Sequence, residues 1–484
     1  MVKRREFLSL ALSASALAPS IAAGAEPVAI GLLSDIHVGD EKQAEVFRKA
    51  LAFIAKRNPD AVVIAGDMAN NGFVWQYELV AAAWEKVFPG DRGPDGRKVA
   101  KVFVNGNHDV EGHTYLAVKT PEERALNEDK AIGPRRAEAW EKCFHEKWEP
   151  IRIREVKGWK FVCTDFGFET EKNLSEFFAK HHAELASQPA FFYVQHKHPF
   201  NTCFGLTVPQ SSHLLRKIFD RYPNMIAISG HSHMSIHDER AIWQGTFTSI
   251  GLSTLAAPVL FGGRENTTRS RLIKTDDEQM PAVYTRPDGK QGMFMWLYPD
   301  RAVVRRDEYV YGETLGPDWT WRFDSMPDSH PYAFETRAKN GIVPAFGSKA
   351  KVEVTVGKGK NRRREEVDQL FVSFPNVLAR DCGTRANDFE IQLETKDTDV
   401  FKIECTKRVY SRYRYLGESR DTKPVVCAFA ISETPSKRLF RFVVRPCDAF
   451  GNFGKPLYSD WFGRSAEVVK YNRYAKLIKE KSGA

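Results

Sequence analysis

Short apolar runs alternate with amphipathic stretches over residues 27–251. The runs are rich in Val, Ile and Phe, as is typical of strands buried in a sheet. Between the first two runs, Phe47, Leu51 and Ile54 recur at helical spacing within 41–57. The pattern predicts strands at 28–33, 61–65, 102–104, 161–163, 191–194 and 225–229. Alternation of this kind predicts an α/β domain.

The pattern changes after about residue 290. Two further strands are predicted at 292–298 and 301–309. From residue 349 onward the strand-like segments follow one another without helices, which predicts a smaller all-β sandwich; these segments are 351–356, 369–374, 389–393, 400–405, 425–431 and 439–445. The resulting division has a larger domain over 26–312, a linker or wrapping loop over 313–346, the sandwich over 347–462 and a tail over 463–484 that resembles a short basic helix.

The first 25 residues predict an export signal rather than part of the fold. They combine a basic start, an apolar middle and the small-residue end Ala23-Gly24-Ala25, so cleavage is expected before Glu26. The pair Arg4-Arg5 resembles a bacterial twin-arginine signal, and the alternative is an ordinary signal peptide with a chance arginine pair. No later segment has the ~20 uninterrupted apolar residues of a membrane span. We therefore expect a periplasmic or extracellular protein.

Composition narrows the choice of partners. The chain has 484 residues, 42% of them hydrophobic and 27% charged, which fits two globular domains. Its net charge of +9 favours anionic partners such as phosphates. The chain also has 62 acidic residues, so this charge alone does not favour nucleic acid as the partner. A phosphorylated polymer is still a possible substrate. The seven cysteines stand singly, so the sequence does not favour a zinc knuckle or a redox CxxC motif. Most are expected to be buried free thiols, and the alternative is one or two disulfides among the four cysteines of the C-terminal part.

Polar side chains suited to metal binding follow five of the predicted strands. In open α/β sheets, ligands bind beyond the carboxyl ends of the strands, so these residues are expected to share one edge. At one strand end they would be ordinary turn and cap residues, but five in order predict a common site. They are Asp35, His37, Asp67, Asn107, His196, His231 and His233, and His108 and Asp109 follow Asn107 directly.

The donor types indicate transition metals. Carboxylates, imidazoles and an amide oxygen, without thiolates, suit Mn, Fe, Zn, Co or Ni better than a structural zinc site. Seven such ligands exceed what one ion with open positions takes, so they fit two ions that share a carboxylate. Two metals ~3.5–4 Å apart promote in-line displacement at phosphorus.

The same residues form five ordered motifs: Asp35-x-His37, Gly66-Asp67, Gly106-Asn107-His108-Asp109, His196 and Gly230-His231-x-His233. This arrangement resembles the calcineurin-like metallophosphoesterase superfamily. The resemblance implies two mixed β-sheets packed as a sandwich and flanked by helices, with a dinuclear centre of Mn, Fe or Zn at the sheet edges. It also implies hydrolysis of phosphate mono- or diesters by attack of a metal-bridging hydroxide.

The resemblance also implies a role for each residue. Asp35, His37 and His233 would bind the first metal, Asp67 would bridge both, and Asn107, His196 and His231 would bind the second. His108 would face the substrate, where it stabilises charge or protonates the leaving oxygen, and Asp109 would hydrogen-bond His108 and orient it. His196 has a local rival in His198, but His196 lies nearer the strand end. His113 is expected to be a surface loop histidine.

Two residues differ from the motifs of the superfamily's better-known groups, so the chain is not expected to belong to those groups. Asn70 stands where a purple acid phosphatase has an iron-ligating tyrosine, and Asp109 stands where a protein Ser/Thr phosphatase has glutamate. The expected relatives are therefore bacterial phosphomonoesterases and phosphodiesterases, some of which carry a fibronectin-III-like domain that the C-terminal sandwich resembles. The expected substrate is a phosphorylated small molecule or polymer. The alternatives are a non-catalytic, metal-stabilised surface-binding protein and a nuclease-type phosphodiesterase.

Overall fold

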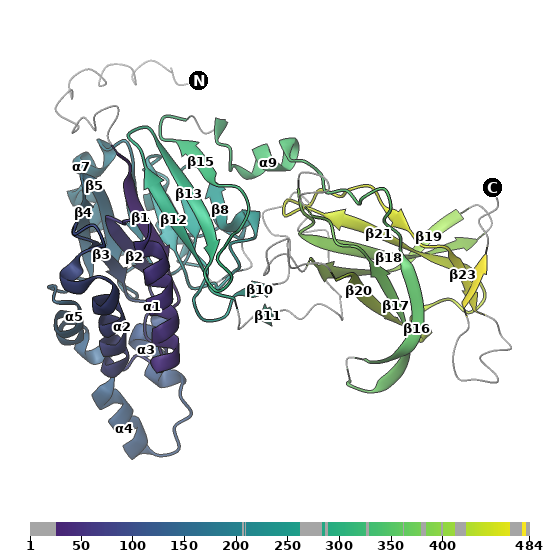
Figure 1. Ribbon diagram of the computed structural model, residues 1–484, viewed down its shortest axis with the longest axis horizontal. Helices are drawn as coiled ribbons and strands as arrows, with labels where there is room; N and C mark the ends of the chain where they lie inside the picture. Colours follow the sequence, from purple (N-terminus) through teal and green to yellow (C-terminus); the bar gives the residue numbers. More distant parts are fainter. Residues whose placement is uncertain are drawn as a thin grey trace, which may run out of the picture.

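The computed structural model describes residues 26–205, 208, 210–261, 283–285, 289–325, 329–361, 363–378, 384–397, 400–411, 423–464 and 477–480. Figure 1 shows an α/β domain beside an all-β domain. The predicted export signal at 1–25 lies outside the described residues. Among the helices of the described part, none has both the length and the apolar character that crossing a bilayer would require.

A seven-stranded mixed sheet forms one half of the α/β domain. Strands β1, β2 and β3 run parallel, and β12 pairs antiparallel with β1. The order across the sheet is β14 (Glu313–Thr314), β13 (Arg301–Glu308), β12 (Gln291–Leu297), β1 (Val28–Leu33), β2 (Ala61–Ala65) and β3 (Ala100–Val104), with β15 (Trp319–Arg322) also paired to β13.

A six-stranded mixed sheet forms the other half. Strands β5, β6, β7 and β9 run parallel, and β4 and β8 pair antiparallel at the two edges. The order is β4 (Ile151–Val156), β5 (Trp159–Thr164), β6 (Phe191–Val194), β7 (Met225–Ser229), β9 (Thr248–Gly251) and β8 (Ile242–Gln244). A separate short hairpin joins β10 (Val259–Phe261) to β11 (Val283–Thr285).

The two sheets pack face to face and helices cover their outer faces. Leu32 and Val63 of the first sheet share one buried core with Phe192 and Ile228 of the second. Residues on the other face of β1–β3 pack against α1, α2 and α5, and those of β5–β7 pack against α6 and α8. The predicted sandwich of two mixed sheets flanked by helices is therefore confirmed. The helices are α1 (Glu41–Ala55), α2 (Val74–Val87), α3 (Asn107–Glu111), α4 (Pro121–Lys130), α5 (Arg136–Phe144), α6 (Glu171–Lys180), α7 (His182–Ala186) and α8 (His213–Phe219).

The segment predicted as a linker at 313–346 contributes strands to the first sheet. β14 and β15 both pair with β13, and Trp319 and Trp321 of β15 are buried against the core between the sheets. Residues 313–314 and 319–322 are therefore strands rather than the predicted linker or wrapping loop, because β15 pairs with β13 and its alternate tryptophans face the core. Helix α9 (Phe334–Asn340) follows and lies between the two domains in Figure 1.

The C-terminal domain is the all-β domain that the sequence predicts. A three-stranded and a six-stranded sheet enclose a core that includes Val372, Phe389 and Phe442. In the described tail, β24 pairs with β23, so the prediction of a helix is wrong there. The strands are β16 (Glu353–Lys360), β17 (Glu366–Phe374), β18 (Asp388–Asp397), β19 (Val400–Tyr410), β20 (Val425–Ala430), β21 (Leu439–Cys447), β22 (Leu457–Tyr458), β23 (Trp461–Arg464) and β24 (Leu477–Glu480).

Charged contacts join the two domains next to the last predicted metal motif. Arg385 of the C-terminal domain hydrogen-bonds through Nη1 to His237 Nε2 at 2.6 Å and through Nη2 to Glu239 Oε1 at 3.1 Å. The same Glu239 oxygen accepts from Arg306 Nη1 at 3.2 Å. Burial would raise the pKa of Glu239, but the arginines lower it to about 2.

Replacing Glu239 with glutamine is expected to lower the free energy of unfolding by about 2 kcal/mol at neutral pH, since hydrogen bonds to a charged group are lost. Because the pKa of Glu239 is lowered on folding, its contribution is present above pH 4.5 and disappears as the pH falls towards 2. Thermal unfolding at pH 7 and pH 3 measures this. Glu78→Gln, at an exposed ion pair with Lys142, is the control and should change little. A wild-type advantage over Glu239→Gln that does not shrink in acid would contradict the assignment.

Candidate metal centre

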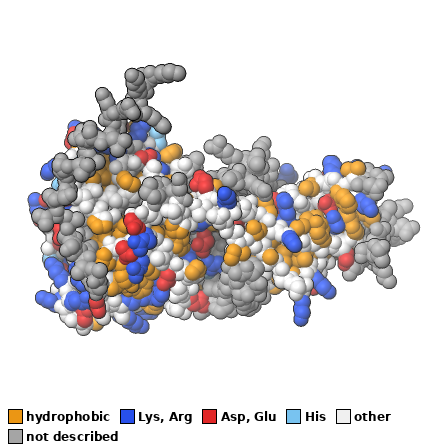
Figure 2. Space-filling model, turned by 90° about the horizontal axis from the view of Figure 1, so that it is seen from above, with side chains coloured by type: hydrophobic (Ala, Val, Ile, Leu, Met, Phe, Trp, Pro, Cys, Tyr) orange, Lys and Arg blue, Asp and Glu red, His pale blue; other side chains and the backbone are white. Residues whose placement is uncertain are grey.

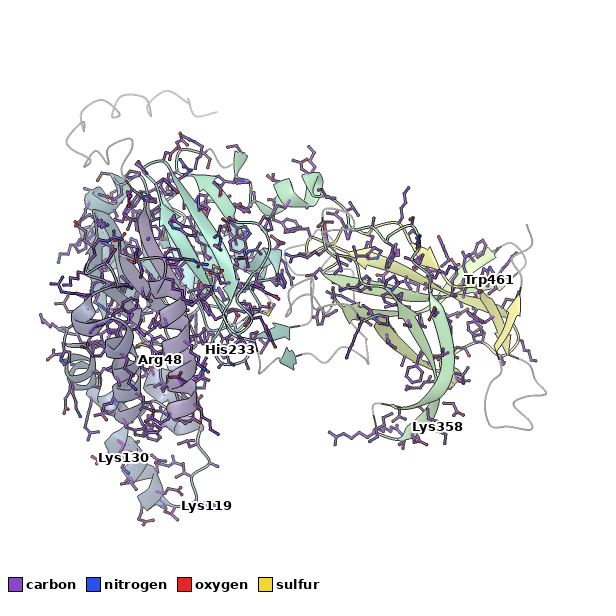
Figure 3. The ribbon with its side chains drawn as sticks, in the orientation of Figure 1. Arg48, Lys119, Lys130, His233, Lys358 and Trp461 are labelled. Atoms are coloured by element: carbon purple, nitrogen blue, oxygen red, sulfur yellow. The ribbon has the colours of Figure 1, made fainter. Side chains whose placement is uncertain are left out.

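The predicted ligands meet at the carboxyl ends of the parallel strands. Asp35 and His37 follow β1, Asp67 follows β2, and Asn107 begins α3 directly after β3. From the second sheet, His196 follows β6, and His231 and His233 follow β7. His233 is labelled in Figure 3 at the end of the sheets nearest β10, and its carbonyl oxygen accepts from Val259 N of that strand. Both sheets therefore contribute to one site.

Six of these side chains form two groups whose ligand atoms lie within 4.8 Å of one another. Asp67 belongs to both groups. The amide of Asn107 adjoins the second, with Oδ1 3.1 Å from His196 Nε2. The first group contains Asp35, His37, Asp67 and His233, and the second contains Asp67, His196 and His231. This division is the one that the resemblance implies for two ions, although ligation itself stays a prediction.

Asp67 presents a single oxygen to both groups. Its Oδ1 accepts a hydrogen bond from His108 N at 2.8 Å, which fixes the carboxylate. Its Oδ2 lies 3.1 Å from His196 Nε2 and 3.6 Å from His37 Nε2. A carboxylate in this position can neutralise charge on both sides, as a bridging ligand does.

The backbone is strained where these ligands stand. Five of them are non-glycine residues in the left-handed region: Asp35 (φ 51°), His37 (φ 52°), Asp67 (φ 53°), His231 (φ 68°) and His233 (φ 53°). Such conformations cost of order 1–3 kcal/mol each and cluster at functional sites.

Glycines let these loops approach one another. A Cβ on Gly106 would overlap Asp67 Oδ1, and a Cβ on Gly230 would overlap Ser34 Oγ and Asp35 Oδ2. Any larger residue at either position would push two ligand-bearing loops apart. The glycines of the third and fifth motifs are therefore required by packing.

The charges within the site depend on one another. Burial would raise the pKa of Asp35, but His233 and His196 beside it hold that pKa below its usual range. Burial would lower the pKa of His196, while Asp67 and Asp35 raise it, to about 10. Burial and His196 lower the pKa of His231 to about 3. The carboxylates are thus ionised at neutral pH and attract cations.

The donor set fits transition-metal ions. His37 Nε2 and His233 Nε2 lie 2.9 Å apart, so both rings present a nitrogen to the same place. In His37 and His196 the second ring nitrogen faces a hydrogen-bond acceptor. His37 Nδ1 lies 3.2 Å from Asn70 Oδ1, and His196 Nδ1 lies 2.7 Å from the carbonyl oxygen of Ala65. Ligating histidines characteristically donate their second N–H to such acceptors.

His108 lies beside the ligand groups but belongs to neither. Its ring centroid is 4.5 Å from that of His37, and its Nδ1 lies 2.7 Å from the carbonyl oxygen of Asn70. The prediction that Asp109 hydrogen-bonds His108 is wrong. The Asp109 carboxylate is fully buried and accepts instead from Ala69 N and Gly106 N, both at 2.7 Å. Asp109 therefore ties together the second and third loops, and Asn70 orients His108.

Asn70 contacts two of the predicted site residues, and the sequence analysis did not predict these contacts. Its side chain accepts from His37 and its carbonyl oxygen accepts from His108. The signal that the sequence offers is its place three residues after Asp67, where a purple acid phosphatase has an iron-ligating tyrosine. Its contacts make it a support for one predicted ligand and for the predicted catalytic histidine.

Replacing Asn70 with leucine is expected to weaken Mn²⁺ binding about 10-fold or more, because His37 loses the acceptor that fixes its ring. Asn70→Asp keeps an oxygen acceptor and should retain most of the affinity. Calorimetric titration of both variants with Mn²⁺ measures this. Equal affinities for the leucine and aspartate variants would show that the His37 contact has no role in metal binding.

Two other histidines that the sequence considered lie outside the groups. His198 is buried, and its ring nitrogens hydrogen-bond to Ser229 Oγ and Ser232 Oγ, each at 2.8 Å. It therefore braces the loop that carries His231. His113 belongs to neither group; it lies half-buried in the short 3-10 helix η2 (Gly112–Tyr115) rather than in the predicted surface loop.

Comparison with known proteins gives a family for this region. The model of the calcineurin-like phosphoesterase family matches residues 28–235, which include all seven predicted ligands. No curated protein matches the chain.

Similar solved structures include three proteins of low sequence identity. GAP50, described as the anchor in the inner membrane complex of Plasmodium, is 14% identical, with 62% of this chain and 89% of that chain covered and a TM-score of 0.35. A dimetal phosphatase from Danio rerio is 12% identical, with coverages of 62% and 100% and a TM-score of 0.35. Vacuolar Protein Sorting 29 from Cryptosporidium parvum is 11% identical, with coverages of 62% and 100% and a TM-score of 0.27. No functional inference follows from similarity at this level.

Proposed function

We propose that the protein hydrolyses phosphate mono- or diesters at a dinuclear metal centre, since residues 28–235 match the model of the calcineurin-like phosphoesterase family. The observation that carries the proposal is the position of Asp67, which is shared by two groups of metal-ligating side chains. A purely structural metal site needs only one such group.

The residues fit two ions of Mn, Fe or Zn. Asp35, His37 and His233 would hold one ion, Asn107, His196 and His231 the other, and Asp67 would contact both. When bound, such a pair supplies Lewis acidity towards the phosphoryl oxygens and lowers the pKa of the attacking water.

His108 supplies proton transfer. A carbonyl oxygen can only accept, so the bond between His108 Nδ1 and the Asn70 carbonyl places a hydrogen on Nδ1. Nε2 is then the ring atom that carries or releases a proton. We assign it the protonation of the leaving oxygen or the stabilisation of charge on the phosphoryl group. This non-ligand histidine has no use in a protein that only binds, which disfavours the non-catalytic alternative.

The remaining proposals concern location and the second domain. The sequence of residues 1–25 supports export by a twin-arginine route to the periplasm or the extracellular space. The strand pattern of the C-terminal sandwich supports a fibronectin-III-like module.

On the face shown in Figure 2, Lys and Arg side chains are scattered over both domains and interspersed with acidic ones, which does not favour a nuclease.

Hydrolysis assays test the proposed function directly. Purified protein is expected to hydrolyse an aryl phosphate monoester or diester, to lose that activity with a chelator and to regain it with Mn²⁺. Comparing kcat/KM over a panel of phosphate monoesters and diesters then shows which of the two ester classes the protein prefers. Hydrolysis that is unaffected by exhaustive chelation, or no hydrolysis of any ester in the panel by protein loaded with two metals, would contradict the proposal.

A further inference from the structure

Tyr115 stands between the predicted metal centre and solvent. It ends the helix η2 and its side chain is 51% exposed. Its ring centroid lies 5.0 Å from that of His108 in an edge-to-face arrangement. Its hydroxyl lies 3.2 Å from Asn107 Nδ2 and 3.2 Å from Glu111 Oε2. One side chain thus contacts a predicted ligand and the predicted catalytic histidine.

The hydroxyl of Tyr115 determines which way the Asn107 amide faces. Asn107 Nδ2 donates to the Tyr115 oxygen, and the Tyr115 hydroxyl in turn donates to the Glu111 carboxylate. The amide nitrogen is therefore turned away from the centre, and Oδ1 points towards His196. Only the oxygen of an amide can ligate a metal, because the NH₂ group is a donor. The hydrogen bond selects the ligating orientation.

The ring of Tyr115 continues a row of rings that leads out of the site. His37 contacts His108 at 4.5 Å between centroids, and His108 contacts Tyr115 at 5.0 Å. The side chain of His37 is only 8% exposed, whereas Tyr115 is half exposed. If His108 protonates the leaving oxygen, the rest of the leaving alcohol extends past His108 towards the Tyr115 ring.

We propose that Tyr115 positions Asn107 for metal binding and selects substrates whose leaving alcohol carries a flat aromatic ring. The inference rests on the proposed function, because it needs the metals and the role of His108. The ring of Tyr115 offers a stacking or edge-to-face contact to such an alcohol, and an aliphatic alcohol cannot make this contact.

Two variants separate the two roles. Tyr115→Phe keeps the ring and removes the hydroxyl, whereas Tyr115→Leu removes both. Calorimetric titration with Mn²⁺ is expected to show about 10-fold weaker binding of one of the two ions in both variants, as is usual for the loss of an outer partner of a ligand. This readout is independent of turnover. Circular dichroism spectra confirm that both variants are folded.

Binding of two non-hydrolysable phosphonates measures the ring contact. Benzylphosphonate and methylphosphonate are titrated into the Mn²⁺-loaded proteins, and the ratio of their affinities is compared. Tyr115→Phe should keep the wild-type preference for benzylphosphonate, and Tyr115→Leu should lose about 3- to 10-fold of it. Tyr458→Leu, at a similarly exposed tyrosine of the C-terminal domain, is the control and should match wild type.

The outcomes distinguish this proposal from the one on which it rests. If the wild type binds two Mn²⁺ and both Tyr115 variants bind them equally well, the positioning role is wrong. If Tyr115→Leu keeps the wild-type preference for benzylphosphonate, the specificity role is wrong. If the wild type itself binds no Mn²⁺, the proposed function is wrong and the Tyr115 proposal is wrong with it.

Discussion

Replacing Asp67 with asparagine is expected to weaken binding of both metal ions and to lower kcat/KM for an aryl phosphate by about 1,000-fold or more. Asp67 belongs to both ligand groups, and its Oδ2 lies 3.1 Å from His196 Nε2 of one group and 3.6 Å from His37 Nε2 of the other. An amide removes the negative charge at this point but keeps the shape of the side chain. Its oxygen can still accept from His108 N, so the fold should survive.

Elemental analysis and steady-state kinetics together measure the effect. Asp324→Asn is the control, since that carboxylate is 70% exposed and pairs with Arg322 across its own turn. It should leave metal content and kcat/KM unchanged. An Asp67→Asn protein that retains two metals and full turnover would exclude Asp67 as the shared ligand.

Replacing His108 with alanine is expected to lower kcat about 100- to 10,000-fold while leaving metal content unchanged. His108 lies outside both ligand groups, and its Nδ1 is engaged by the Asn70 carbonyl. Loss of the ring therefore removes proton transfer without removing a ligand. A variant that loses turnover but keeps both metal ions identifies a residue that acts on the substrate rather than on the metals.

His113→Ala is the matched control for His108→Ala. His113 lies five residues further along in η2, on the same short stretch of chain, but belongs to neither ligand group. It should retain kcat within a few-fold of wild type. The assignment of His108 would fail if both alanine variants kept full turnover, or if His108→Ala lost one of the two metals.

The parts of the fold that the sequence predicted best are buried on both faces. Strands β1, β2, β6 and β7 have the predicted bounds, because a strand covered on one face by a sheet and on the other by helices reads as an unbroken apolar run. The placement of all seven predicted ligands at one edge follows from those strands. Their parallel direction brings the following residues together whatever lies between them in sequence.

The parts that the sequence did not predict depend on contacts between distant residues. Strand β15 lies in the segment predicted as a linker or wrapping loop, because residues 315–345 are rich in Pro, Trp, Asp and Gly. In the folded domain β15 pairs with β13, and Trp319 and Trp321 pack into the core between the sheets. At the site, the contacts of Asp109 and Asn70 also join residues that are distant in sequence, so the sequence did not predict them. Asp109 occupies the first turn of α3, where its carboxylate folds back to Gly106 N and reaches Ala69 N across 40 positions of sequence. That turn directs it away from His108, which no spacing rule shows.

The most direct test of the dinuclear centre is the number of Mn²⁺ ions that the metal-free protein binds in a calorimetric titration. The two ligand groups that share Asp67 predict two ions per chain for the wild type, and weakened binding of both in Asp67→Asn. A wild-type stoichiometry of one, or of none, would contradict the dinuclear centre.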